Sequence, residues 1–187
     1  MGDESPLIQY LREKIGAAIV DFHAYRGDAT VVVRREELLE TFRFLKEDPG
    51  LDFDFLADIT AVDYLGKKQP RFEVVYHLLS LGKNHRLRVK VPVAEDEPAV
   101  DSLTPLWRGA NWLEREVWDM FGIRFHGHPN LRRILLYEEF RGHPLRKDYP
   151  VNQRQPLAPE RPLAGTFVDT RSDNKLLELK QQLERKR

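Results

Sequence analysis

Residues 53–93 read FDFLADITAVDYLGKKQPRFEVVYHLLSLGKNHRLRVKVPV, and this stretch decides the fold. Apolar and polar residues alternate in three runs within it, at residues 53–61, 71–79 and 86–93. Alternation with a period of two predicts strands with one face toward a core and the other toward solvent. In the first run the expected core face holds Phe53, Phe55, Ala57 and Ile59. The loop LGKN predicts a hairpin between the last two strands, and Pro92 predicts a sheet edge at the end of the third.

The residues before this stretch predict two helices and two more strands. The pair Ser5-Pro6 is typical of a helix start, and Asp48-Pro49-Gly50 ends a second helix that begins at Glu36. β-Branched and aromatic residues predict strands at residues 19–23 and 30–34. The order helix, two strands, helix, three strands, helix predicts an α+β fold, with an antiparallel or mixed sheet covered by helices on one face.

The composition limits the classes of function. The 187 residues include 30 Lys and Arg and 30 Asp and Glu, so the formal net charge is zero. Nucleic-acid-binding proteins usually carry a basic excess, and we therefore expect no nucleic-acid partner. The chain has no cysteine, which excludes disulfides, thiol catalysis and cysteine-ligated zinc or iron–sulfur clusters within it. No apolar run approaches the roughly 20 residues of a membrane span, and the acidic first six residues do not resemble a signal peptide. The expected location is the cytoplasm.

The segment NWLEREVWDMFG predicts an amphipathic helix that follows the sheet. Asn111 is expected to cap its start, with Glu114 closing a capping box three residues on. Gly122 stands where a left-handed residue commonly ends a helix. Arg115 and Asp119 lie one helical turn apart, and we expect them to pair on the surface.

Two nearly identical turns come after this helix, Gly127-His128-Pro129 and Gly142-His143-Pro144. We expect each imidazole to bond to the backbone of its own turn. Aromatic side chains and charges of both signs crowd the whole stretch from residue 111 to residue 150. Such a mixture suits a surface that is buried against a partner protein, where Arg pairs with carboxylates and aromatic rings fill pockets.

This stretch closely resembles the signature of a known family. The run EREVWDMFGIRFHGHPNLRRIL, followed by GHPLRKDYP, is similar to the C subunit of the proton-pumping NADH:quinone oxidoreductase, respiratory complex I. The resemblance extends upstream through DITAVDY and RFEVVYH and covers roughly residues 30–150. The charged residues that match the family signature, for which the resemblance implies a role in structure and in docking to other subunits, are Glu114, Arg115, Glu116, Asp119, Arg132, Arg133, His143, Arg146, Lys147 and Asp148.

The resemblance implies a non-catalytic scaffold subunit in the hydrophilic arm of the complex, peripheral on the cytoplasmic side of the cell inner membrane. It implies that the chain itself binds no cofactor, while flavin mononucleotide (FMN), iron–sulfur clusters and quinone belong to partner subunits. The implied main partner is the D subunit of the complex, with the B and I subunits nearby. The complex transfers electrons from NADH through FMN and the clusters to quinone, coupled to proton translocation. On this interpretation, charge reversal at Arg146 should weaken assembly and leave the isolated fold largely intact.

The chain is expected to divide near residue 150. Residues 1–150 would form the α+β core domain, and residues 151–187 an extended docking tail ending in a short helix over residues 172–187. Four prolines from residue 150 to residue 162 are incompatible with a long helix there. The resemblance implies that the tail wraps the D subunit.

Two other hypotheses stay open. One is the equivalent subunit of a related membrane-bound hydrogenase, or of a quinone reductase with another electron donor. The other is a stand-alone metal-dependent hydrolase that uses His126, His128 and His143, since three histidines can hold zinc. A catalytic pair of Glu114 and Glu116 is disfavoured, because residues two apart on a helix point to different faces.

Overall fold

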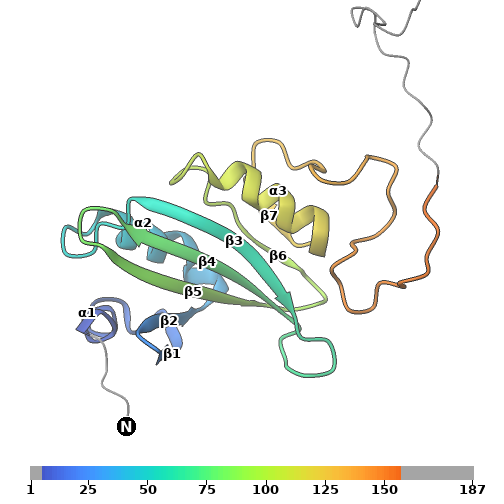
Figure 1. Ribbon diagram of the computed structural model, residues 1–187. Helices are drawn as coiled ribbons and strands as arrows, with labels where there is room; N and C mark the ends of the chain where they lie inside the picture. The colour runs from blue at the N-terminus through green and yellow to red at the C-terminus, as the bar shows by residue number, and fades with distance from the viewer. Residues whose placement is uncertain (1–5, 157–187) are drawn as a thin grey trace, which may run out of the picture. The chain divides into compact units, whose positions relative to one another are not determined.

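Residues 6–156 are described by the structure, which is a computed structural model (Figure 1). Helices and strands follow one another in the predicted order, with one further strand on each side of the last helix. The elements are α1 (Pro6–Ile15), β1 (Ile19–Tyr25), β2 (Asp28–Val33), a 3-10 turn η1 (Arg35–Glu37), α2 (Leu38–Glu47), β3 (Phe55–Asp63), β4 (Phe72–Ser80), β5 (His85–Val93), β6 (Ala99–Asp101), α3 (Ala110–Phe121) and β7 (Arg124–His126).

Five strands form the main sheet, in the order β1-β2-β5-β4-β3. Neighbouring strands are antiparallel except β2 and β5, which run parallel where Thr30–Val32 pairs with Arg88–Lys90. The sheet is therefore mixed, and the predicted α+β fold is confirmed. Strand β5 lies between β2 and β4, but its pairing with β2 ends at Lys90, so only β4 borders the end that holds Pro92 and the edge predicted there is confirmed. Pro92 is tolerated there because it lies beyond the last residue that pairs with β2.

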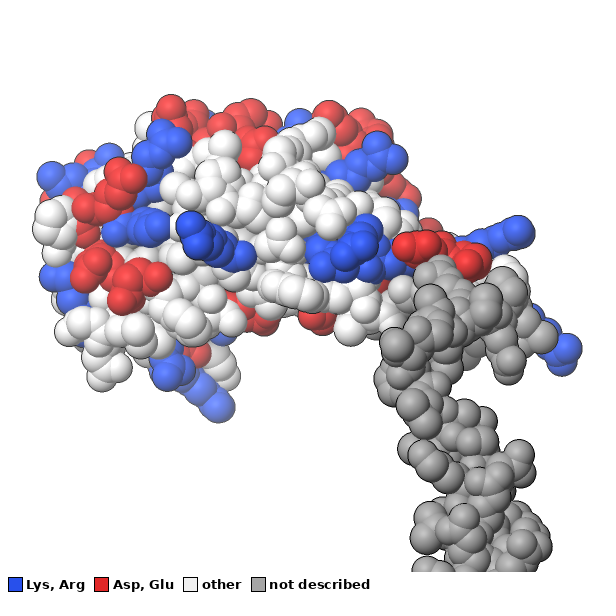
Figure 2. Space-filling view, turned by 90° about the horizontal axis from the view of Figure 1, so that it is seen from above, with Lys and Arg blue, Asp and Glu red and all other residues white. Residues whose placement is uncertain are grey.

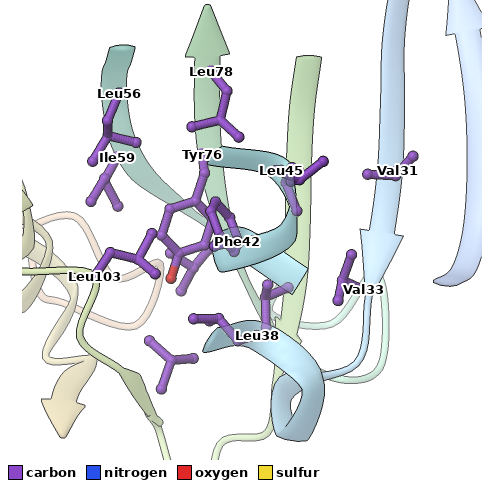
Figure 3. Close-up of a cluster of buried hydrophobic side chains, with 14 of the residues drawn as sticks. Val31, Val33, Leu38, Phe42, Leu45, Leu56, Ile59, Tyr76, Leu78 and Leu103 are labelled. Carbon is purple, nitrogen blue, oxygen red and sulfur yellow. The ribbon is translucent and has the colours of Figure 1, made fainter. Parts of the chain in front are cut away.

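All three helices pack into one apolar cluster with the same face of this sheet. In α2, the spacing of Leu38, Phe42 and Leu45 places these side chains on one stripe. Figure 3 shows Phe42 against Tyr76 of β4, with ring centroids 4.7 Å apart in an edge-to-face arrangement. Burying an apolar side chain of this size stabilises a fold by roughly 1.5–3 kcal/mol. The cluster therefore fixes the sheet against which α3 rests.

A β-bulge divides the predicted core face of the first of the three strands: Phe53 and Ile59 are buried as predicted, whereas Phe55 and Ala57 are exposed. The register of β3 against β4 shifts between Leu56 and Asp58. As a result Leu56 and Ile59 both face the core, while Phe55 is 47% exposed. A bulge sets two residues against one, so simple alternation cannot hold across it.

The short strands β6 and β7, which the sequence did not predict, pair in parallel with each other. Ala99 lies opposite Arg124 at one end of the pair, and Asp101 lies opposite His126 at the other. Parallel neighbours need a crossover connection, and α3 is that connection. The pair therefore holds together the chain that enters α3 and the chain that leaves it.

None of the helices within residues 6–156 is long and apolar enough to cross a membrane. Residues 151–156 carry neither helix nor strand. The helix predicted over residues 172–187 lies outside the described residues, as does the rest of the predicted docking tail. The division of the chain at residue 150 stays a prediction.

Candidate docking site around helix α3

Helix α3 begins two residues earlier than predicted and without the predicted capping box. Its N-cap is Gly109, no side chain caps it, and Asn111 lies within the first turn. The Glu114 carboxylate turns away from the helix start and accepts hydrogen bonds from Ser102 Oγ and from Leu103 N, both at 2.6 Å. Burial raises the pKa of Glu114 to about 7 against the opposing effect of these bonds. Glu114 therefore fastens α3 to the stretch that follows β6.

The left-handed glycine predicted at the end of α3 is confirmed. Gly122 has φ 74°, and its N–H donates to Trp118 O at 2.8 Å. The last carbonyls of a helix have no partners within the helix. Here the second Gly-His-Pro turn and the residues after it supply the donors: His143 Nδ1 to Asp119 O, Leu145 N to Met120 O, and Arg146 Nε to Phe121 O. The second turn is thus a cap for the C-terminus of α3.

The first Gly-His-Pro turn meets the opposite end of α3. His128 donates from Nε2 to Asn111 O at 3.0 Å, and its Nδ1 accepts the N–H of Asn130 at 3.0 Å. His128 therefore bonds to its own turn as predicted, whereas His143 bonds to α3 instead, so for His143 that prediction is wrong. His143 must carry its proton on Nδ1 to donate to a carbonyl, and burial lowers its pKa. The two turns brace α3 at both ends.

Asp119 lies at the centre of the segment after α3. Its Oδ1 accepts Arg133 Nη1 at 2.6 Å, and its Oδ2 accepts three consecutive backbone N–H groups, of Ile134, Leu135 and Leu136, at 3.1, 2.9 and 2.9 Å. Burial alone would raise the pKa of Asp119, but these bonds outweigh it and the pKa is lowered. The carboxylate thereby holds residues 133–136 along the flank of α3.

The predicted surface pair of Arg115 with Asp119 is wrong. Arg115 is buried and donates instead to the carbonyls of Arg132 and Arg133, at 3.1 and 3.0 Å. Its guanidinium also lies 5.1 Å from the ring centroid of Trp112, one turn earlier. Both charges of the expected pair are therefore used to bind the segment after the helix.

A second cluster ties the end of this segment to the sheet. The buried Arg71 forms two hydrogen bonds with Asp63, at 2.9 and 2.7 Å, and further bonds with Glu95 at 2.6 Å and Asp148 at 2.9 Å. Lys147 N donates to Asp63 Oδ2 at 2.8 Å. Despite burial, the bonds from Arg71 and the backbone lower the pKa of Asp63 to about 2. Sequence reasoning did not select Arg71 or Asp63, and the only signal was that both lie in runs that match the family.

The ten signature charges divide into two groups. Seven bind within the chain: Glu114, Arg115, Asp119, Arg133, His143, Arg146 and Asp148. The side chains of the other three are exposed and form no hydrogen bond or ion pair within residues 6–156: Glu116, Arg132 and Lys147. Only this second group is free to meet a partner.

Exposed apolar side chains accompany the three free charges. Trp112, on α3, is 61% exposed, and Leu135 and Leu145, on the segment after it, are 60% and 51% exposed. Figure 2 looks from above Figure 1, where α3 lies, onto a face whose middle is largely uncharged and crossed by separate Lys and Arg side chains. Exposed Trp with a polar surround is typical of protein–protein contact surfaces.

The three histidines of the hydrolase hypothesis do not converge. His128 and His143 bond to opposite ends of α3, and His126 lies exposed in β7. Within residues 6–156 no group of three His, Asp or Glu side chains is placed to hold a metal ion. No observation therefore favours the hydrolase.

Gly122→Ala is expected to destabilise the chain by more than Gly127→Ala does. Both glycines have positive φ, 74° and 77°, so both substitutions carry a left-handed cost of roughly 1–2 kcal/mol. An added Cβ at Gly122 would lie 2.6 Å from the His143 ring and 2.8 Å from Arg146, whereas at Gly127 nothing lies within 4 Å. Overpacking adds about 1–3 kcal/mol. Urea denaturation of the purified chains measures the difference, and equal losses would show that the cap accommodates a methyl group.

The described residues form an α+β domain in which a charged segment braces α3 and exposed apolar side chains lie beside it. The comparisons with known proteins specify the class of protein. The family described as "Respiratory-chain NADH dehydrogenase, 30 Kd subunit" matches residues 31–155. The chain belongs to this family, and the resemblance inferred from the sequence is confirmed.

Relatives match over most of their length. The chain is 49% identical over 151 residues to the C subunit of NADH-quinone oxidoreductase from Citrifermentans bemidjiense, covering 81% of this chain and 92% of the relative. It is 50% identical over 153 residues to the protein of the same name from Roseiflexus sp., covering 82% and 87%. Among solved structures, the trypsin-resistant fragment (1-134) of Nqo5 superimposes with a TM-score of 0.60 at 40% identity, covering 67% of this chain and 98% of the fragment.

A chain of an archaeal respiratory membrane complex, the membrane-bound sulfane sulfur reductase, superimposes with a TM-score of 0.66. The match covers 78% of this chain and 85% of that chain, at 24% identity. At this identity the likeness shows the fold alone. The hypothesis of an equivalent subunit with another electron donor therefore gains no support beyond a shared architecture.

Proposed function

We propose that this chain is the scaffold C subunit of an NADH:quinone oxidoreductase, placed in the hydrophilic arm and itself carrying no electrons. The family match over residues 31–155 supports the complex. The observation that carries the scaffold role is the internal use of the signature: seven of its ten charges bind within the chain, six of them around α3 and Asp148 at Arg71. The signature side chains that hydrogen-bond within the chain fix the position of α3 and of the segment after it. The three exposed signature side chains remain available to bind a partner subunit.

The redox chemistry belongs to partner subunits in this proposal. Electrons from NADH would pass through FMN and iron–sulfur clusters to quinone, with proton translocation coupled to the transfer. This chain has no cysteine to ligate a cluster. Its contribution is to position its neighbours, which follows from a rigid helix with a prepared contact surface.

The D subunit of the complex is the proposed main partner, with the B and I subunits nearby, at the cytoplasmic side of the cell inner membrane. The last described residues support a docking tail that starts on the same surface. Gln155 accepts from Arg141 N and donates to Arg141 O, both at 2.9 Å, and the Tyr137 hydroxyl donates to Pro156 O at 2.8 Å. Residues 155 and 156, the last that the structure describes, thus lie beside the segment that flanks α3.

Reversing the free charges is expected to weaken assembly without unfolding the chain. In the double variant Arg132→Glu, Lys147→Glu, a carboxylate replaces each cation. Each carboxylate would then lie opposite the group of the partner subunit that the cation contacts in the unaltered chain. Misplaced interface charges cost about 1.4 kcal/mol or more each, which is a tenfold loss of affinity per site. Co-purification of the tagged chain with the D subunit from mild-detergent membranes measures the effect.

The matched control is Arg43→Glu, an exposed cation on α2. The control should recover the complex at the level of the unaltered chain. Equal recovery with the double variant, at normal chain levels, would remove Arg132 and Lys147 from the interface. The expectation for Arg146 changes: its Nε bonds to Phe121 O and its guanidinium lies 5.2 Å from the Phe72 ring centroid, so charge reversal there should damage the fold itself.

A further inference from the structure

Strand β1 is an edge of the main sheet, and within residues 6–156 no strand pairs with its outer side. Most of its side chains are exposed, with Val20 at 61% and Tyr25 at 66%. Edge strands are usually protected from further pairing by lysine, proline, a bulge or a covering segment. β1 contains neither lysine nor proline, and its pairing with β2 is irregular only at a bulge between Ile19 and Asp21. The backbone from Asp21 to Tyr25 is therefore open to a further strand.

The hairpin that joins β1 to β2 determines which backbone groups of β1 point outward. The turn Arg26-Gly27 has φ values of 53° and 88°, which are typical of a two-residue type I′ turn. The residues that flank such a turn, here Tyr25 and Asp28, bond to each other through both N–H and C=O. Every second residue of β1, counted back from Tyr25, bonds to β2 in the same way. The residues between them, Phe22 and Ala24, therefore point their N–H and C=O groups away from β2.

The hydrogen bond of Phe22 agrees with this orientation. Its N–H donates to the side chain of its neighbour, Asp21 Oδ1, at 2.8 Å rather than to a carbonyl of β2. Asp21 thus satisfies an edge donor that a further strand would otherwise bind. Phe22 and its partner Val31 face the core of the sheet. The side chains of Asp21 and His23, which alternate with Phe22, therefore lie on the face that the three helices leave uncovered.

We propose that β1 is a strand-addition site for a second copy of this chain, in which two β1 strands pair antiparallel about a two-fold axis at Phe22. Phe22 then exchanges both backbone bonds with its counterpart, and Ala24 lies opposite the second copy's Val20. Asp21 lies opposite the second copy's His23, and the symmetry creates this pair twice. Its members form a non-hydrogen-bonded backbone pair, in which Cα atoms approach to about 4.5 Å and side chains are closest. The imidazole N–H can therefore donate to the carboxylate across the two strands.

The charges along β1 select this register over its neighbours. An axis at Asp21 would oppose two carboxylates, which is destabilising. An axis at His23 would oppose two imidazoles and place Asp21 beside Tyr25. The axis at Phe22 is the one that sets each carboxylate against an imidazole. Complementarity of a surface with itself is the property of a two-fold interface between identical chains, and it favours a second copy over an unrelated strand.

The site is separate from the surface around α3. In the sheet order β1 lies at one edge and β3, against which α3 packs, lies at the other. Pairing through β1 therefore leaves the exposed side chains of Arg132 and Lys147 free in both copies. The inference does not rest on the proposed function, and the two can fail independently.

Sedimentation equilibrium of the full-length chain at about pH 7 tests the pairing. The unaltered chain should show a monomer–dimer equilibrium at concentrations from about 1 μM to about 200 μM. His23→Asp opposes two pairs of carboxylates and should weaken dimerisation roughly tenfold. The double variant Asp21→His, His23→Asp exchanges the two groups and should restore the dimer. His126→Asp, the same substitution at an exposed position of β7, is the matched control and should change nothing.

A backbone variant tests the edge without altering a charge. Ala24→Pro removes an outward N–H and spares the bonds to β2, so it should fold and yet dimerise at least about tenfold more weakly. The pairing would be overturned by an unaltered chain that stays monomeric throughout, or by a double variant that dimerises no better than His23→Asp. A dimer that survives Ala24→Pro would also overturn it. The variant Arg132→Glu, Lys147→Glu should dimerise normally, and a loss there would place the contact at α3 instead.

Discussion

Asp119→Ala is expected to cost about 3–5 kcal/mol of unfolding free energy, the largest single loss on α3, because it leaves a partly buried cation without its partner. In the unaltered chain the Asp119 carboxylate receives Arg133 and three consecutive backbone N–H groups. Without it the Arg133 guanidinium keeps only the carbonyls of Phe140 and Gly142. Urea denaturation of the purified chain, monitored by tryptophan fluorescence and extrapolated to water, measures the loss.

The control for this substitution lies on the same helix. Glu116→Ala removes an exposed carboxylate that binds nothing within residues 6–156, and such surface changes usually stay within about 0.5 kcal/mol. Asp119→Asn, which preserves shape but replaces one acceptor oxygen by a donor, should fall between the two. If Asp119→Ala cost no more than Glu116→Ala, residues 133–136 would not depend on this carboxylate for their position.

Arg71→Met should likewise cost about 3–5 kcal/mol at pH 7, because it leaves the buried Asp63 charge without its cation. Arg71 also donates hydrogen bonds to Glu95 and Asp148. Without Arg71, the end of the segment after α3 would lose the bond to Asp148 that attaches it to the sheet. The pKa of Asp63, about 2 beside Arg71 against an ordinary value of 3.8, gives the loss a defined pH dependence. A lowered pKa stabilises the folded chain above 3.8, and this contribution disappears as the pH falls through 2.

The Arg71→Met penalty should therefore be large at neutral pH and shrink at acid pH, where a proton neutralises Asp63 in the variant. Urea denaturation at about pH 7 and about pH 3 measures both values. Arg35→Met is the matched control, because the Arg35–Glu97 pair at 3.2 Å is largely exposed, and surface pairs contribute about 0–1 kcal/mol. If Arg71→Met lost as little unfolding free energy as Arg35→Met, the bonds of Arg71 to Asp63, Glu95 and Asp148 would contribute no more than a surface ion pair.

The elements of the fold could be predicted from the sequence because each carries a local period. Period-two runs predicted β3, β4 and β5, and the apolar stripe predicted α3 to within two residues. The bulge at Leu56, the parallel pairing of β2 with β5 and the pair β6–β7 carry no such period, since they depend on which strands meet in space. Strand pairing over long sequence separation leaves no mark in either partner alone.

The candidate site was predictable in its members but not in their roles. The family resemblance selected Asp119, Arg133 and Lys147 alike, yet only the structure separates the bonded residues from the free ones. Glu114 illustrates the reason. Its spacing from Asn111 fits a capping box, but its carboxylate accepts hydrogen bonds from Ser102 Oγ and Leu103 N instead. A buried carboxylate needs hydrogen-bond donors nearby, and these two are the donors beside it.

The way α3 ends has a consequence for how the protein is made. Its last carbonyls are met by groups from His143 to Arg146, which leave the ribosome well after the helix itself. In a nascent chain that stops short of Arg146, the last carbonyls of α3 lack some of these donors, so the surface at that end of the helix is incomplete. The C-terminal end of α3 is therefore complete only once residue 146 has been synthesised.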